Sequence, residues 1–170
     1  VWLYSVGRGA VVDSIAAHEG AVSCLSSSHQ HERKLLSGSW DSYVKLWALT
    51  ASGIQCERIL GEHEDKVLSA CLAGRIAASG SAAGLLQMWD PRAGSALIRG
   101  CRAHAGGVTG VAVTSDERMV ISCGLDGSVA STDLRGGRTR MLMEDDAAQW
   151  CAQPAGEAFV FTAGADGTVR

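Results

Sequence analysis

One short pattern occurs four times along this chain, at a step of about forty residues. Each copy begins with a Ser or Thr and continues into a tight turn, and the first two copies end in Trp. The copies are SGSWDSYVKLW (37–47), SGSAAGLLQMW (79–89), SCGLDGSVAST (122–132) and TAGADGTVR (162–170). The turn position falls at Asp41, Ala83, Asp126 and Asp166, so the steps are 42, 43 and 40 residues. A repeat of this length predicts a row of similar structural units.

A histidine precedes three of the copies in a similar frame, at His18, His63 and His104. Between these markers, short apolar stretches alternate with turns that contain Gly, and almost no helical periodicity is present. Gly-His and Trp-Asp punctuation with a period of roughly 40–45 residues is typical of a β-propeller, in which each blade is a four-stranded sheet. The sequence therefore predicts an all-β fold of radially arranged, four-stranded antiparallel blades.

The repeat divides the chain into three complete blades and two part-blades. The segments are 1–16 (third and fourth strands of a preceding blade), 17–60, 61–101 and 102–143 (complete blades) and 144–170 (an incomplete blade). Because both ends cut through a strand, we expect a partial ring from a larger propeller protein, with a closed four-bladed ring as the alternative. A partial ring exposes sheet faces that closure would bury, so we expect the fragment to self-associate through them.

Composition narrows the classes of function. The chain has 170 residues and a formal net charge of −3, and no basic stripe stands out, which argues against a nucleic-acid platform. Its apolar runs are far shorter than the ~20 residues that span a bilayer, which argues against membrane insertion. The six cysteines form no C-x-x-C pair and fall in predicted strands, so we expect reduced thiols and a cytoplasmic location. No cofactor is implied.

The recurring polar residues predict a buried hydrogen-bond network in each blade. Indole N–H only donates, carboxylate only accepts, and hydroxyl and imidazole do both, so Trp, Ser, His and Asp can satisfy one another without water. The candidates are His18, Ser37, Asp41 and Trp47 in the first complete blade, His63, Ser79 and Trp89 in the second, His104, Ser122 and Asp126 in the third, and Thr162 and Asp166 in the last. Three positions depart from the pattern, namely Ala83 for aspartate, Thr132 for tryptophan and Glu144 for histidine.

This pattern resembles that of the WD-repeat family over essentially the whole chain. The resemblance implies a rigid platform for protein or peptide partners, with no catalysis of its own. In that family, partners bind the narrow face of the ring through positions three and five residues after the histidine and one before the turn aspartate. Carried to this sequence, these positions give the candidate partner-binding residues Trp40, Lys66, Leu68, Thr109, Leu125 and Gln149. Trp40 stands out because aromatic side chains are enriched among binding hot spots.

A narrower resemblance concerns residues 3–25 (LYSVGRGAVVDSIAAHEGAVSCL) and 35–47 (LLSGSWDSYVKLW). These segments are similar to the carboxy-terminal repeats of BEACH-domain proteins, and within them to the group of the factor associated with neutral sphingomyelinase activation. The loss of tryptophan in VISCGLDGSVASTDL (120–134) fits the same group. This resemblance implies a scaffold in membrane-linked signalling or trafficking, with a BEACH domain upstream.

The alternative function comes from Trp89-Asp90-Pro91-Arg92. This run matches a W-D-x-R signature, by which some WD-repeat proteins resemble substrate receptors of cullin-RING ubiquitin ligases. An arginine at the end of a strand could bind a carboxylate of an adaptor bidentately.

Other chemical interpretations are weaker than structural ones. His29, His31 and Glu32 suggest a metal site, but no matching cysteine or histidine pair completes the ligand set that zinc needs. The His18–Ser37–Asp41 set suggests nucleophilic catalysis, but it recurs by register in other blades, which favours a structural role. The RGGRTR run at 135–140 resembles an RNA-binding element, but it falls in a predicted hairpin turn. We therefore expect a non-catalytic protein without metal or nucleic-acid partners.

Overall fold

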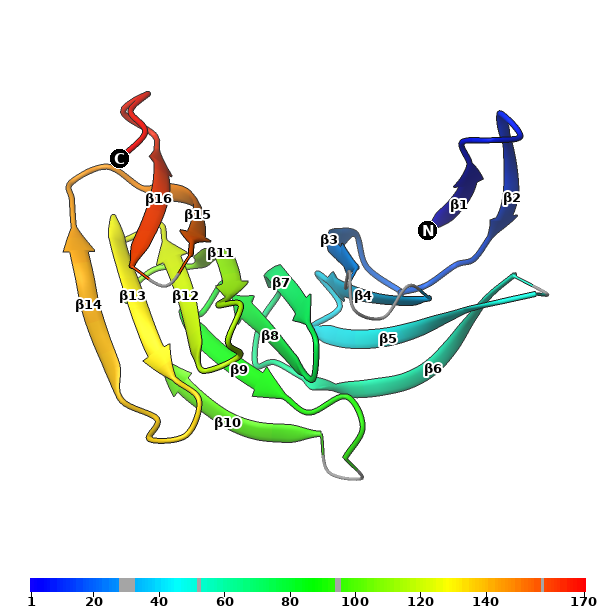
Figure 1. Cartoon of the computed structure of the whole chain (residues 1–170), viewed down its shortest axis with the longest axis horizontal. Helices are drawn as coiled ribbons and strands as arrows, with labels where there is room; N and C mark the ends of the chain where they lie inside the picture. Colours follow the sequence, from blue (N-terminus) through cyan, green and yellow to red (C-terminus); the bar gives the residue numbers. More distant parts are fainter. Residues whose placement is uncertain (28–32, 52, 94–95, 157) are drawn as a thin grey trace.

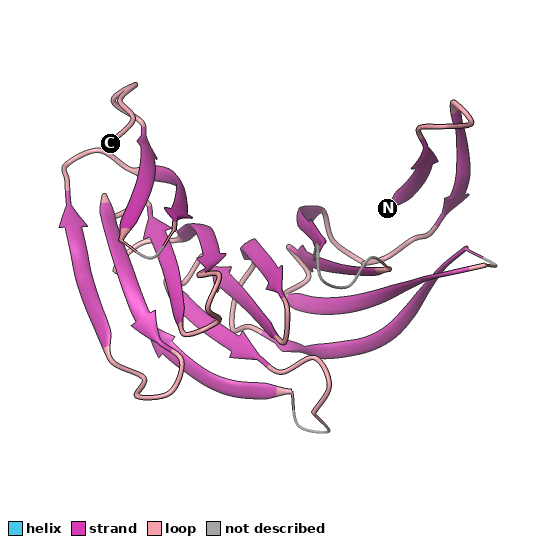
Figure 2. Ribbon diagram, in the orientation of Figure 1, coloured by secondary structure: helices cyan, strands magenta, loops and turns pink. Residues whose placement is uncertain are grey.

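The computed structural model describes residues 1–27, 33–51, 53–93, 96–156 and 158–170. Every regular element within these ranges is a β-strand (Figures 1 and 2). Among the same residues, no helix is long and apolar enough to cross a bilayer.

The strands form three four-stranded sheets flanked by two hairpins. The N-terminal hairpin consists of β1 (Trp2–Ser5) and β2 (Ala10–Ser14). The first blade consists of β3 (Val22–Ser27), β4 (Lys34–Ser39), β5 (Tyr43–Thr50) and β6 (Gly53–Glu62). The second blade consists of β7 (Val67–Ala73), β8 (Ile76–Ser81), β9 (Leu85–Trp89) and β10 (Leu97–Arg102). The third blade consists of β11 (Val108–Val113), β12 (Met119–Gly124), β13 (Ser128–Asp133) and β14 (Thr139–Glu144). The C-terminal hairpin consists of β15 (Gln149–Ala155) and β16 (Phe159–Gly164).

The predicted fold class is confirmed: the sheets follow one another around an open arc, with a hairpin at each end (Figure 1). In each blade, consecutive strands are antiparallel neighbours. The connections between strands one and two and between strands three and four therefore lie on one face of the arc, which we call the loop face. The turns between strands two and three and the histidine segments lie on the opposite face, which we call the histidine face.

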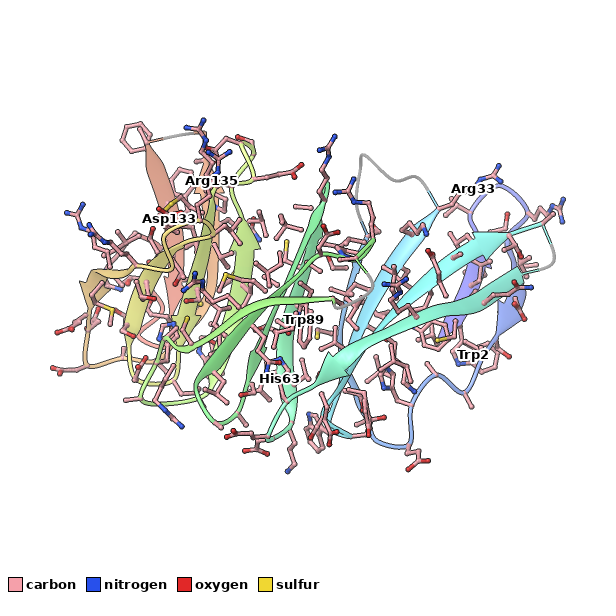
Figure 3. All side chains as sticks on the ribbon, turned by 90° about the horizontal axis from the view of Figure 1, so that it is seen from below. Trp2, Arg33, His63, Trp89, Asp133 and Arg135 are labelled. Carbon is pink, nitrogen blue, oxygen red and sulfur yellow. The ribbon has the colours of Figure 1, made fainter. Side chains whose placement is uncertain are left out.

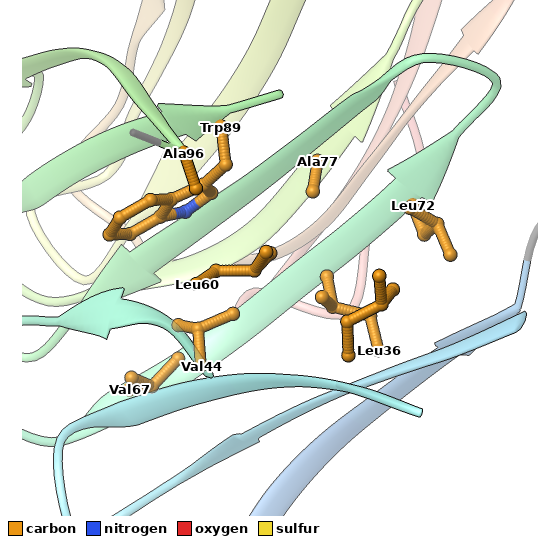
Figure 4. Packing of buried hydrophobic residues seen from close by; sticks show 9 residues of the cluster. Leu36, Val44, Leu60, Val67, Leu72, Ala77, Trp89 and Ala96 are labelled. Atoms are coloured by element: carbon orange, nitrogen blue, oxygen red, sulfur yellow. The ribbon is translucent and has the colours of Figure 1, made fainter. Parts of the chain in front are cut away.

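Apolar side chains between successive sheets form the core. Leu36, Val44 and Leu60 of the first blade pack against Val67 and Trp89 of the second (Figure 4). The Trp89 ring lies so close to Gly61 that a Cβ there would stand 2.5 Å from it, so this approach requires glycine. A second cluster joins the second and third blades in the same way. Blade-to-blade packing thus carries the apolar burial that a single four-stranded sheet could not supply.

A β-bulge recurs at the start of the first strand of each unit. The extra, unpaired residues are Ser23, Leu68, Thr109 and Trp150. The hydroxyls at or beside the bulge cross to the next unit: Ser23 Oγ donates to Val67 O at 2.6 Å, Ser69 Oγ donates to Val108 O at 2.9 Å, and Thr109 Oγ1 donates to Gln149 O. The bulges therefore position the polar links between neighbouring sheets.

Large apolar side chains are exposed on both end hairpins. Trp2 on β1 is 74% exposed and Phe159 on β16 is 72% exposed, and Tyr4 and Phe161 lie beside them on the same strands. Exposed apolar surface of this kind favours association.

We predict that the isolated chain self-associates through these hairpins and that Phe161→Arg weakens the association, because a charge replaces buried apolar surface at the contact. Sedimentation velocity over a concentration series measures the extent of self-association of each variant. Ile98→Arg, the same type of change on the exposed outer strand β10, is the matched control. A chain that stays monomeric at every concentration would contradict the prediction.

Candidate functional site

The first blade contains the complete predicted network. Trp47 Nε1 donates to Ser37 Oγ at 2.8 Å, and Ser37 Oγ lies 2.7 Å from His18 Nε2. Because indole can only donate, the Ser37 hydrogen is free for His18 Nε2, and the second ring nitrogen then donates to Asp41 Oδ2 at 2.9 Å. Asp41 also accepts the backbone N–H groups of Glu19 and Tyr43 at 3.0 Å each. The network therefore ties the histidine segment, the turn and the two strands β4 and β5 together.

Burial and hydrogen bonding set the protonation of this network. Burial lowers the pKa of His18, and the Asp41 carboxylate only partly offsets this effect. Burial raises the pKa of Asp41, but hydrogen bonds from the Tyr43 N–H, the His18 ring and the Glu19 N–H together bring it below its usual range. The side chain of His18 is fully buried and that of Ser37 is buried too. At neutral pH, a neutral imidazole thus bridges a hydroxyl and a carboxylate.

The second blade lacks one partner of this network. Trp89 Nε1 donates to Ser79 Oγ at 2.8 Å, and Ser79 Oγ lies 2.7 Å from His63 Nε2. Ala83 occupies the aspartate position, and the buried His63 Nδ1 has no hydrogen-bond partner among the residues that the structure describes. With no carboxylate to counter burial, the pKa of His63 falls to about 4. An unpaired buried donor of this kind costs about 1–3 kcal/mol.

In the third blade, the network keeps its histidine, serine and aspartate but has a threonine at the tryptophan position. His104 Nε2 lies 2.9 Å from Ser122 Oγ, and its Nδ1 lies 3.1 Å from Asp126 Oδ1. Ser128 donates to the same carboxylate at 2.7 Å. Burial raises the pKa of Asp126, but hydrogen bonds from Ser128 and from the backbone of Ala105 and Ser128 hold it at about 2. Thr132, at the tryptophan position, is buried and pairs with Thr139 across the sheet.

In the C-terminal hairpin, the residue at the histidine position lies one residue later than predicted. Asp145 N donates to Gly127 O, as His63 N donates to Ser42 O and His104 N to Gly84 O. The histidine position of this unit is therefore Asp145, and the prediction of Glu144 was wrong. Thr162 Oγ1 is buried without a partner in the described part of the chain, and Asp166 instead accepts from Thr168 and Arg170.

The same shift changes the candidate partner-binding set. Gln149 is fully buried; its amide donates to Ala147 O at 2.9 Å, and its side chain lies beside Gly164 as the His104 ring lies beside Gly124. Gln149 therefore presents no side chain to a partner, contrary to the prediction. Trp150 occupies the bulge position that Ser23, Leu68 and Thr109 hold in the other units, and it is 54% exposed. In the sequence, a count of five residues from Asp145 instead of Glu144 would have identified Trp150.

The other candidates of the set lie in neighbouring pairs on the histidine face. Trp40 is 53% exposed, and Lys66 Nζ of the next blade lies 5.0 Å from its ring centroid, a cation–π contact. Leu68 is half-buried beside Gly107, whose carbonyl accepts the N–H of the exposed Leu125. Thr109 is half-buried and has its hydroxyl engaged with Cys123 O. Exposed apolar surface on this face thus centres on Trp40, Leu125 and Trp150.

The remaining residues considered for chemistry belong to the W-D-x-R run, the RGGRTR run, the candidate metal site and the cysteines. Trp89 of the W-D-x-R run is buried, whereas the Arg92 side chain is 57% exposed and its backbone N–H donates to Asp90. Arg135 lies in the turn between β13 and β14, where its N–H donates to Asp133. His29, His31 and Glu32 lie outside the described residues; within the described ones, no group of three potential ligands could hold a metal ion. All six cysteines are free thiols.

The matched family model is the WD domain, G-beta repeat, over residues 9–48 and 95–130. The chain belongs to the WD-repeat family. It is 32% identical over 138 residues to F-box/WD repeat-containing protein 9 of Bos taurus, covering 80% of this chain, and 30% identical over 136 residues to the Homo sapiens protein of that name, again covering 80%. This WD-repeat chain spans 28% of the length of either relative. Among solved structures, the computationally designed Ika4 protein superposes with a TM-score of 0.80 at 22% identity, over 92% of this chain and 93% of that one, which shows likeness of fold.

We predict that Asp41→Ala costs about 1–3 kcal/mol more unfolding free energy than Asp166→Ala, because it leaves the buried His18 donor unpaired. Asp166 is exposed, and its carboxylate accepts from Thr168 in its own turn and from Arg170. Urea unfolding of both variants measures the difference. Equal midpoints would contradict the argument.

We also predict that Ala83→Asp stabilises the second blade by about 1 kcal/mol at pH 7, because the carboxylate accepts from His63 Nδ1. The turn backbone suits this change, since Gly84 has φ of 80° where Ser42 has 73° and Gly127 has 78°. Urea unfolding measures the gain. A variant no more stable than the natural chain would contradict the prediction.

The pH dependence of the same variant tests the cause. Because the pKa of His63 is about 4 in the fold and higher in the unfolded chain, the natural chain loses stability as pH falls from about 6.5 towards 4. Ala83→Asp should reduce this loss, since a carboxylate favours the protonated ring. Ala83→Asn, which supplies an acceptor without charge, should gain stability at pH 7 but not acid tolerance.

Proposed function

We propose that this chain is a non-catalytic module that binds a protein or peptide through its histidine face. The observation that carries the proposal is the set of half-exposed Trp40, Leu125 and Trp150 on that face, where two turns and the β15 bulge leave these side chains free of sheet packing. Large aromatic side chains dominate binding energy at protein interfaces. The Lys66 ammonium over the Trp40 ring adds a positive group to the apolar surface.

The polar network supports a binding role over catalysis. Ser37 Oγ is buried, accepts from Trp47 and is engaged with His18, so its hydroxyl has no path to a substrate. A nucleophile needs an accessible oxygen beside its base. The repetition of the same geometry at Ser79 and Ser122 fits a scaffold.

A second, narrower function is supported by the relatives. Two of them are F-box/WD repeat-containing proteins, and Arg92 of the W-D-x-R run is exposed on the loop face. We propose as the alternative that the chain is part of a substrate receptor of a cullin-RING ubiquitin ligase. A role in a BEACH-type protein and a cytoplasmic location remain predictions from the sequence.

Affinity capture from cell extract followed by mass spectrometry tests the first proposal. We expect Trp40→Ala with Leu125→Ala to reduce recovery of a specific partner by about tenfold or more, because each truncation removes hot-spot contacts. Ile98→Ala on the exposed outer strand is the matched control. Unchanged capture by a folded double variant would show that another surface binds.

The ubiquitin-ligase alternative makes a separate prediction. A cullin-RING adaptor should co-purify with the natural chain and be lost with Arg92→Glu, since a carboxylate would repel an adaptor carboxylate. The substrate-side partner should remain bound to this variant. Absence of any adaptor from the natural complex would eliminate the alternative.

A further inference from the structure

The loop face collects arginines that lie far apart in the sequence. Arg33, Arg75 and Arg118 each stand four residues before the network serine of their blade, and all three are exposed. Arg92 and Arg135 follow the third strands of the second and third blades, on the same face. Figure 3 shows Arg33 and Arg135 along one edge of the molecule, with His63 towards the other. The fold thus builds a basic surface that no continuous stretch of sequence displays.

Three aspartates of this face are engaged by their own turns, and Glu117 Oε2 accepts the backbone N–H of Arg75 from the neighbouring blade at 3.2 Å. Asp90 Oδ1 accepts the backbone N–H of Arg92 at 2.9 Å, and Asp133 Oδ1 accepts that of Arg135 at 2.8 Å. Asp116 Oδ1 likewise accepts from Arg118 N at 3.1 Å. The matching side-chain ion pairs are long and solvent-exposed, at 3.4 Å for Arg92 and 3.9 Å for Arg118. Pairs of this type hold their charges weakly, so most guanidinium N–H groups stay available to a ligand.

A cavity of about 390 Å³ opens on this face between the first and second blades. Leu46, Leu72 and Pro91 form its apolar lining. Its polar lining consists of Lys34, Glu57, Arg58 and Arg92. Lys34 pairs with Glu57, and Arg58 donates to Ala93 O across the gap between the blades. The cavity therefore combines an apolar lining with two guanidinium groups, each of which retains unused donors.

We propose that the loop face binds an acidic peptide segment that inserts one aliphatic side chain between the first and second blades, with flanking carboxylates on Arg58, Arg92 and Arg75. Planar guanidinium groups bind carboxylates bidentately, and the cavity suits a branched apolar side chain. This surface is distinct from the histidine face, so the two sites would bind independently.

Two features of the face favour a peptide over nucleic acid. Binding of single strands relies on exposed aromatic rings for stacking, and no aromatic side chain lines the cavity among the described residues. The turn aspartates also interrupt the positive charge, which suits separate carboxylates better than a continuous phosphate backbone.

Fluorescence anisotropy of the 170-residue chain tests the proposal. The probe is a labelled synthetic peptide of glutamates flanking one leucine. We expect saturable binding that weakens with salt, and about tenfold weaker binding by Arg75→Glu with Arg92→Glu. Arg102→Glu, the same charge change where the guanidinium contacts Ala83 O on the histidine face, is the matched control and should bind normally. Circular dichroism verifies folding of each variant.

Two altered probes separate the parts of the proposal. A peptide with glutamines in place of the glutamates should bind more weakly because it lacks the carboxylates that contact the arginines. A peptide with serine in place of leucine should bind more weakly because it lacks the aliphatic side chain that enters the cavity. Equal binding of the leucine and serine peptides, or equal binding by the double variant, would overturn the proposal. So would tighter binding of an oligothymidylate that the double variant abolishes, because the face would then recognise nucleic acid.

Discussion

The buried hydroxyl at the centre of each blade is the interaction on which the rest of the structure depends. Ser37 accepts from Trp47 and engages His18, which in turn reaches Asp41, so one oxygen connects the second and third strands to the segment entering from the previous unit. Such a chain is favourable in a low-dielectric interior only when every donor has an acceptor. This network fixes the position of the turn at Asp41, and that turn exposes Trp40 to solvent.

The histidine face and the loop face follow from the same sheet order but differ in what they offer. Hydrogen bonds from the network hold the histidine face in place, which leaves its exposed apolar side chains preorganised for a partner. The loop face is built from short connections whose aspartates cap their own turns, which leaves arginine side chains projecting. One repeat unit therefore supplies two surfaces of different chemistry.

Sequence reasoning predicted the fold class and the first blade's network because both depend on local register. His18, Ser37, Asp41 and Trp47 recur at near-constant spacing, and that spacing maps directly onto neighbouring strands. The prediction of Gln149 as a partner-binding residue failed because the segment before β15 has no histidine from which to count. An error of one residue there selects the buried Gln149 in place of the exposed Trp150. Sequence reasoning also missed the basic surface, since Arg33, Arg75 and Arg118 lie far apart in the sequence and share one face only because the blades stack side by side.

The hydroxyl links between blades have a further consequence for how the molecule opens. Ser23, Ser69 and Thr109 each donate to the backbone of the following unit, so these hydroxyls couple each of the three blades to its immediate neighbour. In such a linear array, stability is a sum of unit and interface terms. The units here are unequal, with a complete network in the first blade and an unpaired Thr162 in the C-terminal hairpin. The resistance to local unfolding therefore differs from unit to unit, and the first blade, with its complete network, is held more firmly than the C-terminal hairpin.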